Sequence, residues 1–414
     1  MRCGRQGVKK ALLGRSTSLS LRILVLNTDY GEFLNWFYGQ RTELQSASYA
    51  EQLQERMMSR FGVADFYSNN LRRLGHEVWD VHANNAFMQQ AWARENGLCV
   101  DGPDAKQSPL QALLQRCNRS GVARTPLRHL KRYCSALLGS NNSEPEWSYR
   151  ILAAQIKKYR PDVLLNQAMD GISNRFLSDM KPHVKLLVGQ HAAPLPSNEE
   201  FSAYDLVLSS LPNFVAYFRK MGLPAALHRL AFEPRLLDDL ENGGQEISVC
   251  FVGSLSTHHN SRLELMEYLC GRLDVKVWGP DPYGLPRNSS IRRSYMGQLW
   301  GRDMYQMLRH AKITLNHHIG IASCYANNMR LFESTGVGSL LLTDWKQNLS
   351  EMFEPGKEVV AYRTPEECLE RMEYYLAHEE ERASIARNGQ QRTLREHNYR
   401  DRMGEFVEIV REYI

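Results

Sequence analysis

Short apolar runs, arranged in two series along the chain, constrain the fold most strongly. Each run is too short for a helix and has the near-continuous apolar character of a parallel strand that is buried on both faces. The first series lies at 22–26, 77–81, 163–166, 185–188 and 206–209, and the second at 247–252, 275–278, 313–316, 339–343 and 359–362. Helical patterns separate the runs, so each series predicts a doubly wound parallel sheet in an α/β fold.

The helical patterns and one polar stretch set the expected domain limits. Helices are predicted at about 48–74, 147–159, 173–180, 213–221, 261–273 and 365–377. The polar, Gly-containing stretch 234–246 separates the two series, as a linker does. We therefore expect a basic, disordered lead at 1–21, a Rossmann-like domain at 22–233, the linker at 234–246, a second Rossmann-like domain at 247–396 and a terminal helix at 397–414.

Two basic stretches lie outside this alternation of predicted strands and helices. The lead at 1–21 lacks the apolar centre of a secretory signal, and a basic membrane-surface arm is the alternative to a disordered lead. An insertion at about 96–145 is polar and rich in arginine. Long insertions in compact domains are often functional, so it is either an acceptor or membrane contact or a merely solvated segment.

Charge and cysteine content narrow the class of protein. The 414 residues carry a formal net charge of +5, which suits an anionic ligand or membrane surface but is too weak for a dedicated nucleic-acid binder. The eight cysteines form no CxxC pair, which indicates reduced thiols in a cytoplasmic protein. No apolar stretch approaches the roughly 18 residues that span a bilayer, so any membrane contact would be peripheral, at the inner face.

Several catalytic motifs are absent from the sequence. It has no GxxxxGK[ST] loop, no GxGxxG after the first strand, and no GxSxG or HExxH. These absences argue against P-loop phosphotransferases, classical dinucleotide enzymes, α/β-hydrolases and zinc proteases. A DxD at a strand end, which would hold a metal against a nucleotide-sugar diphosphate, is also missing.

The segment 327–343 carries the most informative pattern. A helix is expected to begin near Asn328 and end at Gly336, with Arg330 and Glu333 on one face. A helix N-terminus with an arginine suits a diphosphate, and a carboxylate suits the hydroxyls of a ribose. A surface ion pair explains the same spacing and is the alternative.

The C-terminal third of the chain resembles a known enzyme family. The matching positions are Arg330, Phe332, Glu333, Gly336, Gly338, Thr343, Asp344, Leu349, Phe353, Gly356, Glu358, Arg382, Ala386, Gly389, His397, Tyr399 and Arg402. In order and spacing they resemble the C-terminal module of group 1 glycosyltransferases, in the spore-maturation-protein branch. Gly253 and Arg262 extend the likeness to the start of the second domain, whereas the N-terminal half fits only loosely.

The resemblance implies a GT-B fold, in which two Rossmann-like domains face each other across a cleft. It implies that the second domain holds the nucleotide, the first holds the acceptor, and transfer needs neither metal nor cofactor. Glu333 matches the glutamate that binds the donor ribose, and Gly253 the glycine that passes the diphosphate. Arg262 is the best candidate for the phosphate-binding cation, because Ser254 stands where the family has a basic residue.

Two departures from the family pattern matter. Many retaining members carry a second glutamate at the position of Tyr325, so its role near the sugar would fall to Asn327 or Asn328. Retention of configuration is therefore an expectation only. The stretch 257–260 also departs from the family in the phosphate region and leaves the donor base open.

Polar residues at strand ends of the first domain are further candidates, because ligands bind beyond the carboxyl ends of such strands. His191 would orient the sugar or assist proton transfer, with a structural capping role as the alternative. Asp29 would border the acceptor, with turn chemistry as the alternative, and Asp170 has the same status.

The sequence thus predicts a glycosyltransferase that uses a nucleotide-sugar donor of unknown base. The acceptor is open among a glycan, a lipid-linked glycan, a protein and a small molecule. A nucleotide-sugar epimerase of the same fold and a non-catalytic nucleotide-sugar-binding protein are the alternatives. A nucleic-acid-modifying transferase is a weaker one, since it rests on the basic insertion alone.

Overall fold

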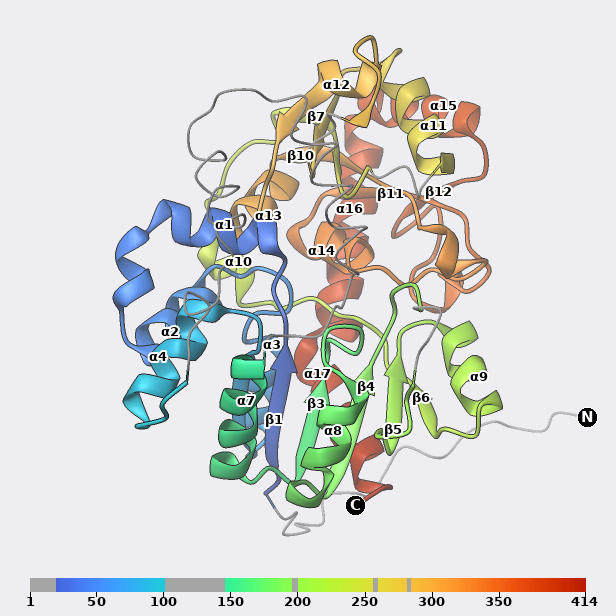
Figure 1. Ribbon diagram of the computed structural model, residues 1–414. Coiled ribbons are helices and arrows are strands. Elements are labelled where there is room, and N and C mark those ends of the chain that lie inside the picture. Colours follow the sequence, from blue (N-terminus) through green and yellow to red (C-terminus); the bar gives the residue numbers. More distant parts are fainter. Residues whose placement is uncertain (1–19, 101–145, 196–199, 256–259, 281–283) are drawn as a thin grey trace, which may run out of the picture.

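The computed structural model describes residues 20–100, 146–195, 200–255, 260–280 and 284–414. These residues form two six-stranded parallel sheets with helices packed on their faces (Figure 1). The basic lead up to residue 19, most of the predicted insertion (101–145) and residues 257–259 lie outside the described residues. Among the described residues, no helix combines the length and apolarity needed to cross a membrane.

The N-terminal sheet has the strand order β2-β1-β3-β4-β5-β6. Its strands are β1 (Arg22–Asn27), β2 (Glu77–His82), β3 (Val163–Asn166), β4 (Leu186–Gln190), β5 (Leu206–Ser209) and β6 (Ala225–Leu227). The helices of this half are α1 (Gly31–Gln40), α2 (Tyr49–Met58), α3 (Phe66–Arg73), α4 (Ala86–Glu95), α7 (Glu146–Tyr159), α8 (Asn174–Met180) and α9 (Pro212–Lys220).

The C-terminal sheet has the strand order β12-β11-β10-β7-β8-β9. Its strands are β7 (Ile247–Val252), β8 (Val275–Trp278), β9 (Tyr295–Gly297), β10 (Ala311–Asn316), β11 (Leu340–Asp344) and β12 (Val360–Tyr362). Short α10 (Leu236–Asp239) lies between the sheets in the chain, followed by α11 (Asn260–Cys270), α12 (Ser290–Ser294), α13 (Gly301–Arg309), α14 (Arg330–Val337), α15 (Pro365–Ala377), α16 (Glu379–Glu396) and α17 (Tyr399–Arg411).

Every strand predicted from the apolar runs is present, and the α/β fold class is confirmed. Two edge strands, β6 and β9, were not predicted, because each has only three residues and β9 is mostly exposed or half-buried. The single helix predicted at 48–74 is wrong. The structure has α2 and α3 there, separated by a turn in which Arg60, Gly62 and Ala64 take positive φ values that no α-helix allows.

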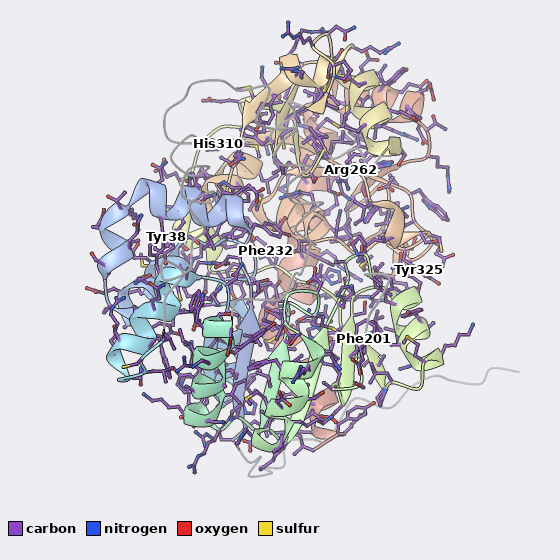
Figure 2. All side chains as sticks on the ribbon, viewed as in Figure 1. Tyr38, Phe201, Phe232, Arg262, His310 and Tyr325 are labelled. Atoms are coloured by element: carbon purple, nitrogen blue, oxygen red, sulfur yellow. The ribbon has the colours of Figure 1, made fainter. Side chains whose placement is uncertain are left out.

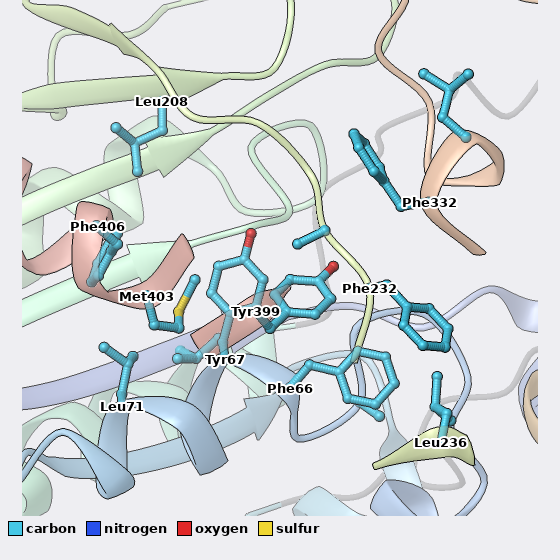
Figure 3. Packing of buried hydrophobic residues seen from close by; sticks show 14 of the residues in the cluster. Phe66, Tyr67, Leu71, Leu208, Phe232, Leu236, Phe332, Tyr399, Met403 and Phe406 are labelled. Atoms are coloured by element: carbon cyan, nitrogen blue, oxygen red, sulfur yellow. The ribbon is translucent and has the colours of Figure 1, made fainter. Parts of the chain in front are cut away.

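The chain crosses between the two halves more than once. Phe232, in the segment before α10, donates its backbone N–H to His397 O and accepts from Tyr399 N. From there α17 runs back onto the N-terminal half and packs against α3. Figure 3 shows the shared core, where Phe66 and Tyr67 of α3 lie against Tyr399 of α17. The terminal helix of the chain is thus part of the N-terminal hydrophobic core.

A second contact joins the start of α13 to the N-terminal half. Trp300 packs into a cluster around Phe33 and Phe61. Next to it, Arg302 donates its backbone N–H to Ser59 O at 2.9 Å. Gly301 has φ +52° and no room for a Cβ, which would lie 1.9 Å from the same Ser59 oxygen. The turn between α2 and α3 therefore touches the C-terminal half directly.

Candidate functional site

The order of the C-terminal strands marks where a ligand would bind. Strands β7 and β10 are neighbours in the sheet. The chain continues from β7 to β8 towards one edge of the sheet and from β10 to β11 towards the other edge. In doubly wound sheets, ligands lie at this switch point, beyond the carboxyl ends of the two strands. Gly253 directly follows β7 and His317 directly follows β10, so both residues lie at the switch point.

Two glycines leave no side chain between adjacent loops at the switch point. Gly253 donates its backbone N–H to Trp278 O, and a Cβ on Gly253 would lie 3.1 Å from the ring of Phe251. A Cβ on Gly279 would lie only 2.1 Å from Gly253 O. The main chains after β7 and β8 are therefore in direct contact, and a bulkier residue at 279 would separate them.

Arg262, in the first turn of α11, links the loops after β7 and β10. Its Nη1 donates to Ser254 O at 3.0 Å and its Nη2 to His317 O at 2.6 Å. The side chain is buried, and burial lowers the pKa of its guanidinium. Figure 2 shows Arg262 within the C-terminal half, and its Nε has no partner among the described residues. The predicted phosphate-binding cation thus lies at the switch point, held by backbone carbonyls.

Arg330 and Glu333 form a buried ion pair on α14. Their Nη1 and Oε2 atoms are 2.7 Å apart, and the two side chains are 13% and 7% exposed. Glu333 Oε1 also accepts from the hydroxyl of Tyr305 at 3.2 Å, and Arg330 Nη2 donates to Val252 O at 3.3 Å. The alternative of a surface ion pair is wrong. The pair instead ties α14 to α13 and to the end of β7.

The two asparagines before α14 face different partners. Asn328 Nδ2 donates to Asn316 Oδ1 at 2.6 Å, next to the switch point, and its own Oδ1 has no partner among the described residues. Asn327 Nδ2 donates to Ser210 Oγ at 3.2 Å, across to the N-terminal half. Tyr325, the residue at the family's glutamate position, packs half-buried against the hydrophobic cluster of the N-terminal sheet (Figure 2).

His191 follows β4 at the carboxyl end of the N-terminal sheet. Its backbone N–H bonds to Leu208 O, its ring lies 5.8 Å from that of Phe214, and its Nε2 has no partner among the described residues. Burial lowers the pKa of His191, so its ring is neutral at pH 7. A neutral imidazole with an unpaired Nε2 at a strand end can accept a proton or a hydrogen bond.

Asp29 does not join the residues of the second domain. It follows β1 but turns into a buried network, with 2.6 Å between Arg56 Nη2 and Oδ1 and 3.0 Å between His82 Nδ1 and Oδ2. Its side chain is 1% exposed. Asp170, by contrast, is exposed after β3. The structure therefore gives Asp29 a set of internal partners that the turn pattern did not indicate.

A cavity of about 360 Å³ opens at the carboxyl ends of β10, β11 and β12. It is lined by Ser261, His317, His318, Ile319, Gly320, Asp344, Trp345, Lys346, Tyr362 and Arg363. Sequence reasoning did not assign these residues to a site, although Asp344, His317 and Arg363 all directly follow or end strands. Within the described residues, no group of three or more His, Cys, Asp or Glu side chains is arranged to hold a metal.

Solved structures share this arrangement over nearly the whole chain. HepE from Anabaena in complex with UDP-glucose aligns with a TM-score of 0.54 and 11% identity, covering 95% of this chain and 100% of that chain. A glycosyltransferase from Rickettsia africae aligns with a TM-score of 0.52 and 10% identity, covering 95% and 98%. The chain has the GT-B glycosyltransferase fold. AviGT4, a glycosyltransferase of avilamycin A biosynthesis, agrees, with a TM-score of 0.53, 15% identity and 95% and 98% coverage.

The sequence comparison points to the same class. Residues 262–408 match the family model described as glycosyl transferase-like. The match begins at Arg262 and includes the Arg330–Glu333 pair and the first turns of α17. No match was found among curated proteins. The GT-B fold predicted from the resemblance is confirmed.

Proposed function

We propose that this protein is a glycosyltransferase that moves a sugar from a nucleotide-sugar donor bound at the switch point of the C-terminal sheet. The observation that carries the proposal is the buried Arg330–Glu333 pair at the end of β7, inside the segment that matches the glycosyl transferase-like family. The pair holds a guanidinium against the carbonyl of Val252, the residue before Gly253, with a carboxylate bonded to that guanidinium. We further propose that the chain belongs to the spore-maturation-protein branch.

Each residue of the switch point has a role in this proposal. Glu333 accepts hydrogen bonds from the ribose hydroxyls, in exchange for its bond from Tyr305. The diphosphate lies against the main chain at Gly253, near Arg262 and the start of α14, where the positive end of the helix dipole favours an anion. Asn328 keeps an unpaired Oδ1 beside this position and can receive a sugar hydroxyl.

The transfer step needs charge stabilisation more than proton transfer. As the bond from the anomeric carbon to the phosphate oxygen breaks, positive charge builds on the sugar and the electron pair leaves with the phosphate. Arg262, Arg330 and the N-terminal end of α14 offset that negative charge, the role a metal has in other transferases. The acceptor oxygen then bonds to the anomeric carbon, with retention as the proposed outcome.

The first domain supplies the acceptor side. The ring of His191 is neutral and its Nε2 has no partner among the described residues, so we propose that it orients the sugar or receives the acceptor proton. Asp29 acts on the acceptor region only indirectly, by holding Arg56 and the turn between α2 and α3. The acceptor itself is a glycan, a lipid-linked glycan, a protein or a small molecule.

Calorimetric and thermal titrations with UDP, GDP, dTDP, ADP and CMP test the donor site. UDP comes first because HepE, which has the same fold, binds UDP-glucose. A nucleotide at about 100 times its dissociation constant should add about 2.7 kcal/mol to the unfolding free energy. Glu333→Gln should weaken that nucleotide by roughly tenfold or more, since bonds to a charged group contribute about 1.5–3 kcal/mol.

Glu233→Gln is the matched control. Glu233 is equally buried and bonds to Arg235 at 3.0 Å, but it lies in the segment before α10. Equal losses of affinity in both variants, or no binding of any nucleotide at millimolar concentration, would refute the donor site. Product analysis with the matching nucleotide sugar then separates the functions, because only a transferase needs an acceptor and an epimerase converts the donor alone.

A further inference from the structure

The cavity at the ends of β10, β11 and β12 adjoins the proposed diphosphate site. Ser261, which lines it, precedes Arg262 in α11. His317, which also lines it, gives its carbonyl oxygen to Arg262 Nη2 at 2.6 Å. Because the sugar of a nucleotide-sugar is bonded to the diphosphate, a pocket that shares these residues is within reach of that sugar.

Asp344 is the one carboxylate among the described residues that line the cavity, and its charge is already compensated. Asp344 Oδ1 accepts from His318 Nδ1 at 2.6 Å and from the His318 backbone N–H at 3.0 Å. Asp344 Oδ2 lies 3.2 Å from Lys346 Nζ, which also donates to Ser323 O. The charges of Asp344 and Lys346 therefore offset each other. As a result, the Asp344 carboxylate does not strongly repel an anion in the cavity.

Arg363 gives the cavity a positive charge, and no acidic side chain among the described residues compensates it. Its guanidinium carbon lies 4.1 Å from the centroid of the Trp345 ring, so the aromatic face holds it in position. No carboxylate within 4.0 Å pairs with it among the described residues, although its backbone N–H donates to Glu367. An arginine fixed on an aromatic ring with its N–H groups free is suited to bind a carboxylate or phosphate with two parallel hydrogen bonds.

A neutral hydrogen-bond donor, the Ser261 hydroxyl, also lines the cavity. Tyr362 donates its hydroxyl to Asn316 O at 3.0 Å, so His317 Nδ1, at 3.0 Å from the same hydroxyl, must be the donor to it. His317 Nε2 is then an acceptor, and Ser261 Oγ lies 3.5 Å from it. This contact is at the limit of a hydrogen bond, so the Ser261 hydroxyl is available to a ligand.

We propose that this cavity binds a negatively charged group, a carboxylate or phosphate, on the sugar part of a substrate, and that Arg363 recognises the charge. Its volume of about 360 Å³ lies at the lower end of the range of small-ligand sites. The inference rests on the proposed function, because that function identifies the charged molecule as a sugar substrate of a glycosyltransferase. The charged group belongs either to the donor sugar or to a phosphorylated acceptor, and the two sources can be told apart.

The experiment is calorimetric titration of the full chain with paired probes. UDP-glucuronate is compared with UDP-glucose, and glucose 6-phosphate is compared with glucose, for the wild type and Arg363→Gln. Arg272→Gln is the matched control, because Arg272 also lies over an aromatic ring, Tyr268, at 3.9 Å, but outside the cavity. Arg363 and Arg272 are both exposed, and a thermal melt of each variant checks that it folds.

We expect the charged probe of one pair to bind about tenfold more tightly than its neutral partner, the lower limit for a bond between charged groups. Arg363→Gln should abolish that preference and Arg272→Gln should keep it. A preference within the UDP pair assigns the charge to the donor, and one within the glucose pair assigns it to the acceptor.

Two results would overturn the inference: equal binding within both pairs, or equal loss of the preference in both variants. The failure of the proposed function looks different. If neither UDP-sugar binds but glucose 6-phosphate binds through Arg363, the anion site stands and the donor site falls.

Discussion

Asp29 offers the sharpest quantitative test, because sequence and structure suggest different roles for it. Arg56 binds the Asp29 carboxylate through Nη2 at 2.6 Å and Nε at 3.0 Å, and both side chains are at most 2% exposed. Arg56 keeps its charge when the partner is removed, and its remaining contacts are Ser59 Oγ, the Phe61 carbonyl and two aromatic rings. Asp29→Asn preserves the shape of the side chain, removes its charge and replaces one acceptor oxygen with an NH2 donor.

The expected cost follows from that geometry. Breaking a buried ion pair from one side destabilises a protein by about 3–5 kcal/mol, because the other charge stays buried. Burial alone raises the pKa of Asp29, but His82 and Arg56 outweigh it and hold the pKa well below its usual range. A carboxyl with a depressed pKa stabilises the fold fully above its unfolded pKa of about 3.9, and this contribution is lost as the pH falls towards the folded pKa.

Urea unfolding at pH 7, followed by circular dichroism, measures the effect, and nucleotide binding is measured in parallel. We expect Asp29→Asn to lose about 3–5 kcal/mol of unfolding free energy. The double variant Asp29→Asn, Arg56→Gln should recover part of the loss, since no buried charge is left over. A loss below about 1 kcal/mol would refute the structural role of Asp29.

Three further predictions concern the backbone contacts and one buried histidine. Gly279→Ala places a Cβ 2.1 Å from Gly253 O, so we expect nucleotide binding at least about tenfold weaker by calorimetry; unchanged affinity would contradict the close approach. Gly301→Ala places a Cβ 1.9 Å from Ser59 O at φ +52°, and a scanning calorimeter should show a lower unfolding temperature. Burial lowers the pKa of His228 to about 4, so the unfolded chain takes up its proton first, and stability should fall by about 3 kcal/mol between pH 6.5 and pH 4. In urea titrations at both pH values, His228→Phe should remove that part of the fall, and an equal fall in the variant would contradict it.

The fold was largely predictable because buried parallel strands have a strong local signature. The runs at 163–166, 206–209 and 275–278 coincide with β3, β5 and β8 to the residue. The break between α2 and α3 was not predictable from periodicity. It follows from Arg60 and Ala64, whose positive φ values are stabilised by contacts formed only after folding, such as the ion pair of Arg60 with Asp239.

The candidate site was predictable only where its residues are local. The spacing of Arg330 and Glu333 places them on one helix face, and the structure pairs them. Their other partners, Tyr305 and Val252, come from different elements and leave no mark near α14 in the sequence. The bridge made by Arg262 likewise depends on two loops that meet only when β7 and β10 are neighbours.

The segment between β10 and α14 joins the two halves of the proposed reaction. At its start, His317 and His318 line the cavity next to Arg262. Four residues after His318, Ala322 is fully buried in the hydrophobic cluster of the N-terminal sheet, and Ile321 O accepts from Asn213 Nδ2 at 3.2 Å. Because one short segment holds both the cavity wall and the contact between domains, a rotation of the first domain must either break these contacts or move the wall. The wall of the cavity and the contact between the two halves are therefore mechanically coupled, and neither local periodicity nor spacing in the sequence could have indicated it.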